Sequence, residues 1–470
     1  MSRPFHTCGG MTFSQNKVWF SMGKHRVLTV VCAAVASICI GIIAAANGKA
    51  AILAAAGVLI ATISMAIPAI PVVATMNAAL YKQMEVMQSI SVLDPTVMFA
   101  LVSIFCLAAR MLLSRTSREA MGQNCSLLLW FIAFCMGMSM GAMGPYSTQY
   151  GTEKLLRFIG LAGPLVFLAS TWDLSDIEEY FGLLLITSSI VALLQVLPID
   201  IGSAYGDASA PNYLARGRWT GYGAILAPMP WYRMVPTRWG RFISISAWVL
   251  CTYVLLAVGG RGPIIAYVLS LLITQMFGLA FDGKALSHRR LKGILASVAV
   301  LVLAVYLIVW APIDAFALAR AKFQLLMSPE RGASTWTRAE LFRAALSYFA
   351  EHSIRGVGLG GFALERSQTA ARVYPHNLVL EILSETGVVG FLPFAGLIVA
   401  SLRGYRRAIH RSNRRERVLL ESALAVLLFA FLNAMVSGDI NDNRMVFVML
   451  PIVHSLVTKQ NSSYLIERAE

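Results

Sequence analysis

Residues 373–390 read VYPHNLVLEILSETGVVG, a polar stretch that stands between long apolar runs. Pro375 fixes φ and suits the first turn of a helix, so the sequence predicts His376 at a helix start. Glu381 and Glu385 are four residues apart and would share one helix face. An imidazole placed between apolar runs is a candidate general base. Taken alone, the stretch favours the competing interpretation, a histidine that only caps a helix.

The composition is that of a membrane protein. Of the 470 residues, 57% are hydrophobic and only 13% are charged, and the mean hydropathy is +0.67. Apolar runs near 20 residues recur along the chain, which predicts a polytopic helical membrane protein. The first 25 residues are polar, so we expect no cleavable signal peptide. We interpret the net charge of +15 as basic cytoplasmic loops and expect no nucleic-acid partner.

The apolar runs predict the spans 26–46, 49–74, 95–113, 125–144, 154–171, 175–197, 218–234, 241–258, 262–280, 292–312, 387–403, 416–435 and 444–459. Loops 282–292 and 403–417 are rich in lysine and arginine and should be cytoplasmic. Counting back from them leaves the basic N-terminus outside, unless residues 26–74 make one net crossing. Pro68 and Pro71 could break the helix there. We therefore predict an all-α fold with about 12 transmembrane helices and both ends inside.

The domain organisation follows from this topology. We expect a cytoplasmic N-terminus over 1–25, a transmembrane bundle over 26–312, an extracytoplasmic loop domain over 313–386, C-terminal transmembrane helices over 387–459 and a cytoplasmic tail over 460–470. Within the loop domain, residues 335–349 predict an amphipathic helix whose apolar stripe is Leu341, Ala345 and Phe349. Residues 356–362, GVGLGGF, predict a flexible turn, and nucleotide binding there is a weak interpretation because no strand–helix unit surrounds the glycines.

Basic residues gather on the predicted outer side. The loop domain has an excess of arginine, and shorter outer loops add Lys154, Arg157, Arg216 and Arg218. Guanidinium groups match phosphate oxygens, which favours an anionic ligand, although a solvated basic face is an equally good interpretation. Arg261 stands in a tight turn between two spans, where an arginine is either functional or reaches toward the interface.

Residues 437–444, SGDINDNR, precede the last predicted span. The mixture of glycine with aspartate and asparagine favours a turn over a metal site. Asp439 could orient His376 or an arginine.

Taken in order, these motifs resemble the O-antigen ligase and polymerase superfamily. The resemblance covers about residues 210–450 and is carried by Arg261 between glycines, TWTRAELFRAAL over 335–346, HSIRGVGLGGF over 352–362, the stretch over 373–390 and SGDINDNR. It is strongest to the O-antigen ligases of lipopolysaccharide assembly. It implies a GT-C-like glycosyltransferase in the inner membrane of a Gram-negative bacterium, with its site open to the periplasm. The implied donor is O-antigen on undecaprenyl diphosphate, and the implied acceptor is lipid A–core.

The resemblance also implies residue roles. His376 would be the general base, and Arg261 and Arg338 would be catalytic and would bind the donor diphosphate. Weaker candidates for diphosphate binding, supported mainly by their predicted side and their charge and not by the resemblance, are Lys154, Arg157, Arg216 and Arg218. We expect supporting roles for Asn377, Glu381 and Asp439. Direct attack by the acceptor would invert the anomeric centre, so we expect inverting transfer. Because arginines can stabilise a diphosphate leaving group, we expect no metal and no cofactor.

Three alternatives stay open at this point. An O-antigen polymerase would use the same donor, but only one outer loop is large. A protein O-oligosaccharyltransferase often has an additional periplasmic C-terminal region, whereas this chain ends about a dozen residues after its last predicted span. A lipid-linked glycan flippase would favour repeated halves and charged relays within the membrane, and the sequence has no repeat.

Overall fold

The computed structural model describes residues 59–81, 94–144, 147, 149–197, 213–228, 238–258, 260–282, 333–363 and 373–455, with isolated residues between 295 and 324. The chain divides into two compact units, Met1–Ile67 and Pro68–Glu470. Throughout the described residues the regular elements are helical and no strand occurs, which confirms the all-α class. Among the described residues of the second unit, the helices are α3 (Ala69–Tyr81), α5 (Pro95–Leu113), α6 (Arg115–Gln123), α7 (Cys125–Ala142), α8 (Gln149–Arg157), the π-helical turn η1 (Phe158–Ala162), α9 (Gly163–Ser170), α10 (Leu174–Val196), α12 (Tyr213–Leu226), α13 (Arg238–Ala257), α14 (Arg261–Asp282), α17 (Ala333–Glu351), α19 (Leu378–Ile409), α20 (Arg414–Ala434) and α21 (Arg444–Ser455).

Within the described part of the chain, six helices are long and apolar enough to cross a membrane. They lie in α5, α7, α10, α13, α19 and α20, and α3, α14 and α21 contain shorter apolar segments. These helices confirm a multi-pass membrane protein. Predicted span 26–46 and nearly all of 292–312 lie outside the described residues, so the count of twelve stays a prediction. The helical run 59–66 ends before Pro68, where the sequence predicts a break.

Local sequence sets where several helices begin. The Asp94 side chain accepts a hydrogen bond from Thr96 N at 2.8 Å, and proline occupies the first turn of α5. Reciprocal capping boxes start α10, at Asp173 and Asp176, and α20, at Asn413 and Glu416. These caps satisfy backbone N–H groups that a helix start leaves without partners.

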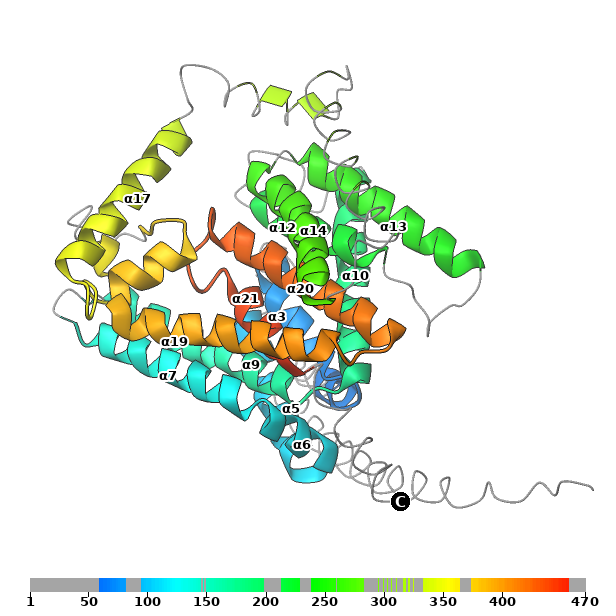
Figure 1. Cartoon of the computed structure of the whole chain (residues 1–470), viewed down its shortest axis with the longest axis horizontal. Helices are drawn as coiled ribbons and strands as arrows, with labels where there is room; N and C mark the ends of the chain where they lie inside the picture. Colours follow the sequence, from blue (N-terminus) through cyan, green and yellow to red (C-terminus); the bar gives the residue numbers. More distant parts are fainter. Residues whose placement is uncertain are drawn as a thin grey trace, which may run out of the picture. The chain divides into compact units, whose positions relative to one another are not determined.

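Helices α7 and α19 lie side by side and antiparallel (Figure 1). A side chain on Gly137 of α7 would meet the Gly390 backbone at 2.9 Å, and one on Gly396 would meet the Trp130 ring at 2.5 Å. Small residues at these crossings let two membrane helices approach closely. Helix α7 therefore packs closely against α19 between Gly390 and Gly396.

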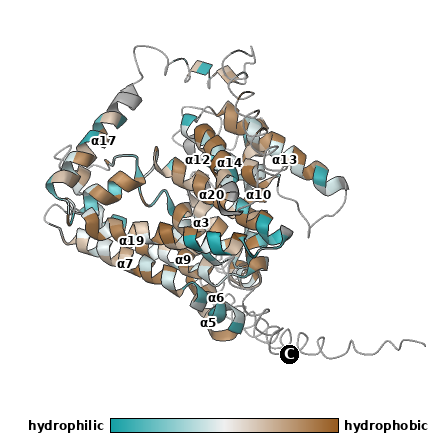
Figure 2. Ribbon diagram, in the orientation of Figure 1, coloured by the Kyte–Doolittle hydropathy of each residue, from teal (hydrophilic) through white to brown (hydrophobic). Residues whose placement is uncertain are grey.

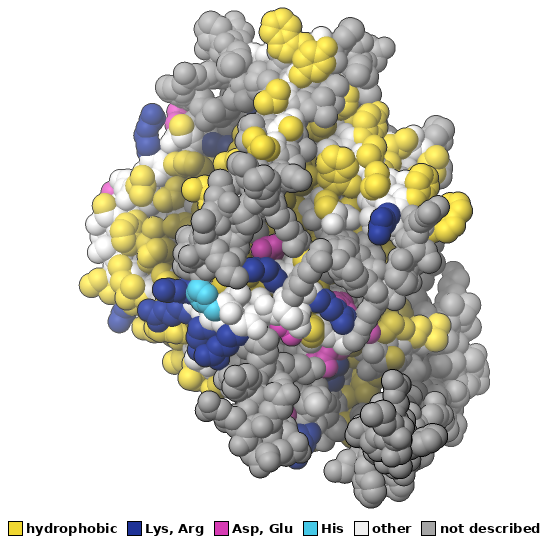
Figure 3. Space-filling view, turned by 45° about the vertical axis from the view of Figure 1, so that its right-hand side comes forward, with side chains coloured by type: hydrophobic (Ala, Val, Ile, Leu, Met, Phe, Trp, Pro, Cys, Tyr) yellow, Lys and Arg dark blue, Asp and Glu magenta, His cyan; other side chains and the backbone are white. Residues whose placement is uncertain are grey.

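The outward faces of the helices are apolar. Figure 2 shows hydrophobic residues in brown along much of α7 and α19, and Figure 3 shows apolar side chains in yellow over much of one face. Large side chains that are more than half exposed include Leu101, Leu129, Met136, Phe242 and Leu392. Such surface suits contact with lipid and not with water.

Helix α19 is broken at Gly387, whose φ of 61° and ψ of −157° are accessible essentially to glycine alone. A break leaves carbonyl and N–H groups without helical partners. Loop 353–358 supplies those partners through four backbone hydrogen bonds: Val357 N to Ser384 O at 2.8 Å, Gly358 N to Glu385 O at 3.1 Å, Val388 N to Ser353 O at 2.8 Å and Val389 N to Ile354 O at 3.2 Å. The glycine-rich segment is thus a packed turn that holds the start of α19.

The predicted amphipathic helix over 335–349 is confirmed as α17. Leu341 and Ala345 are buried and form a small core with Phe362. Tyr348, which is not part of the predicted stripe, also packs against this core, and its ring lies 5.5 Å from that of Phe362 between centroids. This core attaches α17, and with it Arg338, to the glycine-rich turn.

Candidate functional site

His376 lies in the connector before α19, in a backbone conformation with φ of +55°. The left-handed region costs a residue with a Cβ roughly 1–2 kcal/mol, and such strain concentrates at functional sites. The helix begins at Leu378, later than the sequence predicts, so Pro375 is outside its first turn. Asn377 is the cap: its Oδ1 accepts from Leu380 N at 3.0 Å, and its Nδ2 donates to Met435 O at 3.1 Å. Asn377 therefore ties the histidine connector to the end of α20.

Directly after the cap, Glu381 and Glu385 both reach Lys154 of α8. The Lys154 ammonium lies 2.6 Å from Glu385 Oε2 and makes a second ion pair with Glu381, and all three side chains are almost fully buried. The predicted shared face of the two glutamates is thereby confirmed. A buried ion pair adds little net stability, but removing one partner leaves a costly charge. The group fixes α8 against α19 beside the histidine.

Residues 437–443 form a turn, as the sequence predicts. Gly438 has φ of 79°, and Arg218 Nη2 donates to Ser437 O at 2.7 Å. Asp439 Oδ2 accepts from the Tyr150 hydroxyl at 3.0 Å, which connects the turn to α8. In the described residues, no group of three or more His, Cys, Asp or Glu side chains is placed to hold a metal ion.

These elements enclose a polar cavity of about 450 Å³. Six of the residues singled out from the sequence line it: Lys154, Arg157, Arg218, Arg338, His376 and Asp439. They come from α8, α12, α17, the histidine connector and the 437–443 turn, segments that are far apart in the sequence. The cavity gathers cationic groups around one imidazole and two carboxylates, those of Asp439 and Asp442.

Two predicted arginines lie outside the cavity lining. Arg261 is the first residue of α14 and is half-buried, and a side chain on its neighbour Gly262 would meet Val436 at 2.9 Å. Since Ser437 lines the cavity, the start of α14 is close to its wall. Arg216 is buried and donates to Gln195 Oε1 at 2.9 Å. Asn377 and Glu381 lie next to the cavity and not in its lining.

Sequence reasoning missed several lining residues. Tyr150 and Arg444 both line the cavity, together with the aromatic side chains of Trp219 and Tyr222. Arg444 ends the SGDINDNR motif, so its position next to the polar turn was a usable signal. Tyr150 had no signal of its own, because its role depends on the contact with Asp439 that folding creates.

The environment of His376 favours its neutral form. Burial lowers the pKa of the imidazole, the Arg338 guanidinium lowers that pKa further, and Asp439 partly opposes both. Its Nδ1 atom is buried without a hydrogen-bond partner among the described residues, and the Tyr374 ring lies 4.5 Å away between centroids. A neutral imidazole at the wall of a polar cavity can accept a proton near pH 7.

Part of the chain matches a known protein family. Residues 246–395 match the family model described as O-antigen ligase, a range that contains Arg261, Arg338 and His376. No curated protein matches the chain. Members of the matched family are membrane enzymes of the glycosyltransferase type. The matched range is less than half of the chain, and it supports the resemblance to the O-antigen ligase and polymerase superfamily.

Proposed function

We propose that the protein is an O-antigen ligase. It transfers a finished glycan from undecaprenyl diphosphate to a sugar hydroxyl of lipid A–core, in the inner membrane of a Gram-negative bacterium, with the cavity open to the periplasm. The observation that carries the proposal is the cavity itself, which brings His376 and Arg338 together with Arg157 and Arg218. An imidazole among arginines suits an alcohol acceptor and an anionic leaving group.

His376 acts as general base in this proposal. It accepts the proton of the acceptor hydroxyl as that oxygen bonds to the anomeric carbon of the donor, while the bond from that carbon to the diphosphate oxygen breaks. One direct attack inverts the anomeric centre, and undecaprenyl diphosphate leaves with its electron pair. The strained connector and the Asn377 cap keep the imidazole at the cavity wall.

The arginines bind the diphosphate and stabilise its developing charge. Arg338, Arg218 and Arg157 line the cavity, and we add Arg444 to this group. Arg261 contacts the donor from the start of α14, close to the cavity wall. Arg216 supports the α12 backbone that carries Arg218, since its guanidinium is held by Gln195. A guanidinium keeps its charge through the reaction, which a diphosphate leaving group requires.

Buried groups behind the wall position this machinery. Lys154 lines the cavity, but its ammonium is shared by Glu381 and Glu385, so we propose that it orients α8 and the donor side of the cavity instead of providing the main diphosphate contact. Asp439 holds Tyr150 and partly offsets the arginine charge near His376.

The test uses a strain that lacks this gene, complemented with wild-type protein or with His376→Ala. Lipopolysaccharide gels and an assay of undecaprenyl-linked glycan are read together. A ligase leaves polymerised glycan on the carrier and bare lipid A–core in the deletion strain, and His376→Ala reproduces that state. Core capped by a single repeat unit would instead identify a polymerase and overturn the proposal. Failure of the carrier-linked glycan to reach the outer face would identify a flippase.

A further inference from the structure

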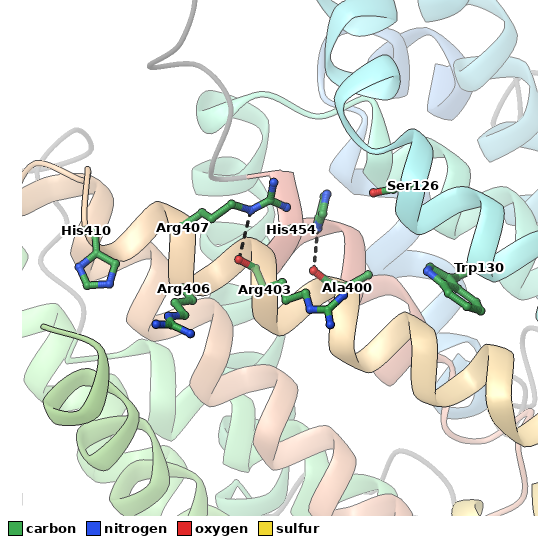
Figure 4. Close-up of a pocket in the computed structure, with 8 residues that line it drawn as sticks. All are labelled: Ser126, Trp130, Ala400, Arg403, Arg406, Arg407, His410 and His454. Atoms are coloured by element: carbon green, nitrogen blue, oxygen red, sulfur yellow. Dashed lines mark hydrogen bonds between the residues drawn. The ribbon is translucent and has the colours of Figure 1, made fainter.

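A second pocket lies at the opposite end of α19 from His376. It has a volume of about 670 Å³ and is lined by Ser126, Trp130, Ala400, Arg403, Arg406, Arg407, His410 and His454. These residues come from α7, α19 with its C-cap His410, and α21 (Figure 4). None of these lining residues has a carboxylate, so the described pocket contains no acidic group to balance its charge.

The α19 side of the pocket is a cationic face. Arg403, Arg406, Arg407 and His410 are exposed, and their spacing of three, four and seven residues places them along one side of the helix. Cations complement the dipole at a helix C-terminus, which accounts for some positive charge there. The dipole does not account for a hollow shared with two other helices. Figure 4 shows the Arg407 side chain reaching toward His454 of α21.

The far wall of the pocket is fixed by close packing. His454 of α21 is buried, and its Nδ1 lies 3.1 Å from Ala400 O. A side chain on Gly404 would meet that Nδ1 atom at 2.7 Å, so glycine is needed for the histidine to lie against α19. Arg407 Nε donates to Arg403 O at 3.3 Å, which orients one guanidinium across the pocket. The basic groups are therefore held around a hollow and are not simply spread over a surface.

The pocket lies at the level of a lipid headgroup. After its break at Gly387, α19 would rise on the order of 32 Å from Val388 to Ile409, close to a hydrocarbon thickness of about 30 Å, and the pocket residues of α19 lie in the last part of that rise. Apolar side chains lie one helical turn from lining residues: Leu129, three positions after Ser126, is 61% exposed, and Val399, four positions before Arg403, is 44% exposed. Trp130 itself is 44% exposed, and tryptophan favours the membrane interface.

We propose that this pocket binds the phosphate of an anionic phospholipid on the side of the membrane opposite to His376. Arg403 and Arg407 contact the phosphate oxygens, with Arg406 and His410 adding positive charge at the rim. The acyl chains lie along the apolar surface beside Leu129 and Val399. This apolar continuation selects a lipid and not free phosphate. The inference does not depend on the proposed transferase reaction.

Native mass spectrometry of the full-length protein, released from detergent with added phosphatidylglycerol, tests the proposal. The pocket variant is Arg403→Gln with Arg407→Gln. The matched control is Arg115→Gln with Arg118→Gln, which removes the same charge from a basic segment outside the pocket. We expect retention of phosphatidylglycerol to fall about tenfold in the pocket variant and to be unchanged in the control. Phosphatidylcholine is retained weakly by all three proteins.

Equal loss from both double variants would overturn the proposal, because it would indicate only bulk charge. Displacement of phosphatidylglycerol by inorganic phosphate would also overturn the proposal, because the pocket would then be a site for free phosphate and not for a lipid. If the pocket variant does not fold, Arg403→Lys with Arg407→Lys keeps the charge and loses the guanidinium geometry. The lipid should raise the melting temperature of the wild-type protein more than that of this variant, and an equal rise would contradict the proposal.

Discussion

At one end of α19, the basic side chains around His376 share a cavity with Asp439, and Lys154 behind them is buried against two glutamates. At the other end, Arg403, Arg406 and Arg407 are exposed and line a pocket that has no carboxylate among its described residues. Both ends are basic, yet only the first combines burial, paired charge and a strained imidazole. The number of arginines therefore does not identify a reactive site, whereas the fixed environment of a titratable group does.

The largest expected effect is a difference in transfer rate between substitutions of His376 and His410, which lie near opposite ends of α19. His376→Ala removes the proposed base and should lower the transfer rate by roughly 100- to 10,000-fold, the range of general base catalysis. His410→Ala, at the other end of α19, should change it by no more than about twofold. Rates are measured with purified protein, lipid-linked donor and lipid A–core. A similar loss in both variants would mean that the two ends do not differ in the way we describe.

The buried ion pairs of Lys154, near His376, should affect the free energy of unfolding. Lys154→Met leaves two buried carboxylates without their cation and should lower the free energy of unfolding by about 3–5 kcal/mol. The matched control is Arg115→Met, which breaks an exposed pair with Glu119 and should cost about 0–1 kcal/mol. Denaturation in detergent, followed by helical circular dichroism, measures both values. Equal, small changes would show that the Lys154 group is not the buried network found here.

The broken helix gives a smaller effect. Gly387→Ala requires an unfavourable φ and brings a methyl group 2.5 Å from the Ile354 carbonyl carbon, so we expect destabilisation of about 1–3 kcal/mol. Gly122→Ala in α6 is the control, because a side chain there meets nothing within 4 Å, and alanine should stabilise that helix by up to about 1 kcal/mol. Thermal melts of the two variants should shift in opposite directions. A shift of both melting temperatures in the same direction would contradict the requirement for glycine at the break in α19.

The last prediction is that removing divalent metal ions has no effect on the transfer rate. Because arginines are proposed to neutralise the diphosphate, treating purified protein with a divalent-metal chelator should leave the transfer rate unchanged. The assay is repeated after adding back Mg²⁺ or Mn²⁺. Loss of activity on chelation that either ion restores would contradict metal-independent transfer.

The sequence predicted the helices well, because an apolar run of about 20 residues has few other stable solutions near a membrane. The spans predicted at 95–113 and 241–258 each coincide with a helix of the structure. It also predicted His376 and Arg338 as site residues, and both line the cavity. These predictions rest on local pattern and on motif resemblance, and such information is present in single segments of the chain.

The sequence could not give the contacts between segments. Nothing near Lys154 indicates that its ammonium meets carboxylates more than 200 positions away, and Tyr150 carries no pattern that points to Asp439. The left-handed backbone of His376 was also missed, because a proline before it suggested an ordinary helix start. Such features depend on packing among α8, α19 and the 437–443 turn, which no local pattern encodes.

The central claim is that His376 is the base and that Arg338 and Asp439 set its pKa in opposite directions. The pH profile of kcat/KM tests it most directly. Transfer requires neutral imidazole, so the rate should fall as pH drops through the pKa of His376, with a midpoint below 6.5, its ordinary value, since burial and Arg338 lower that pKa. Arg338→Gln should move the midpoint to higher pH, and Asp439→Asn should move it to lower pH. A wild-type midpoint above 6.5, or a midpoint that neither substitution moves, would contradict the account.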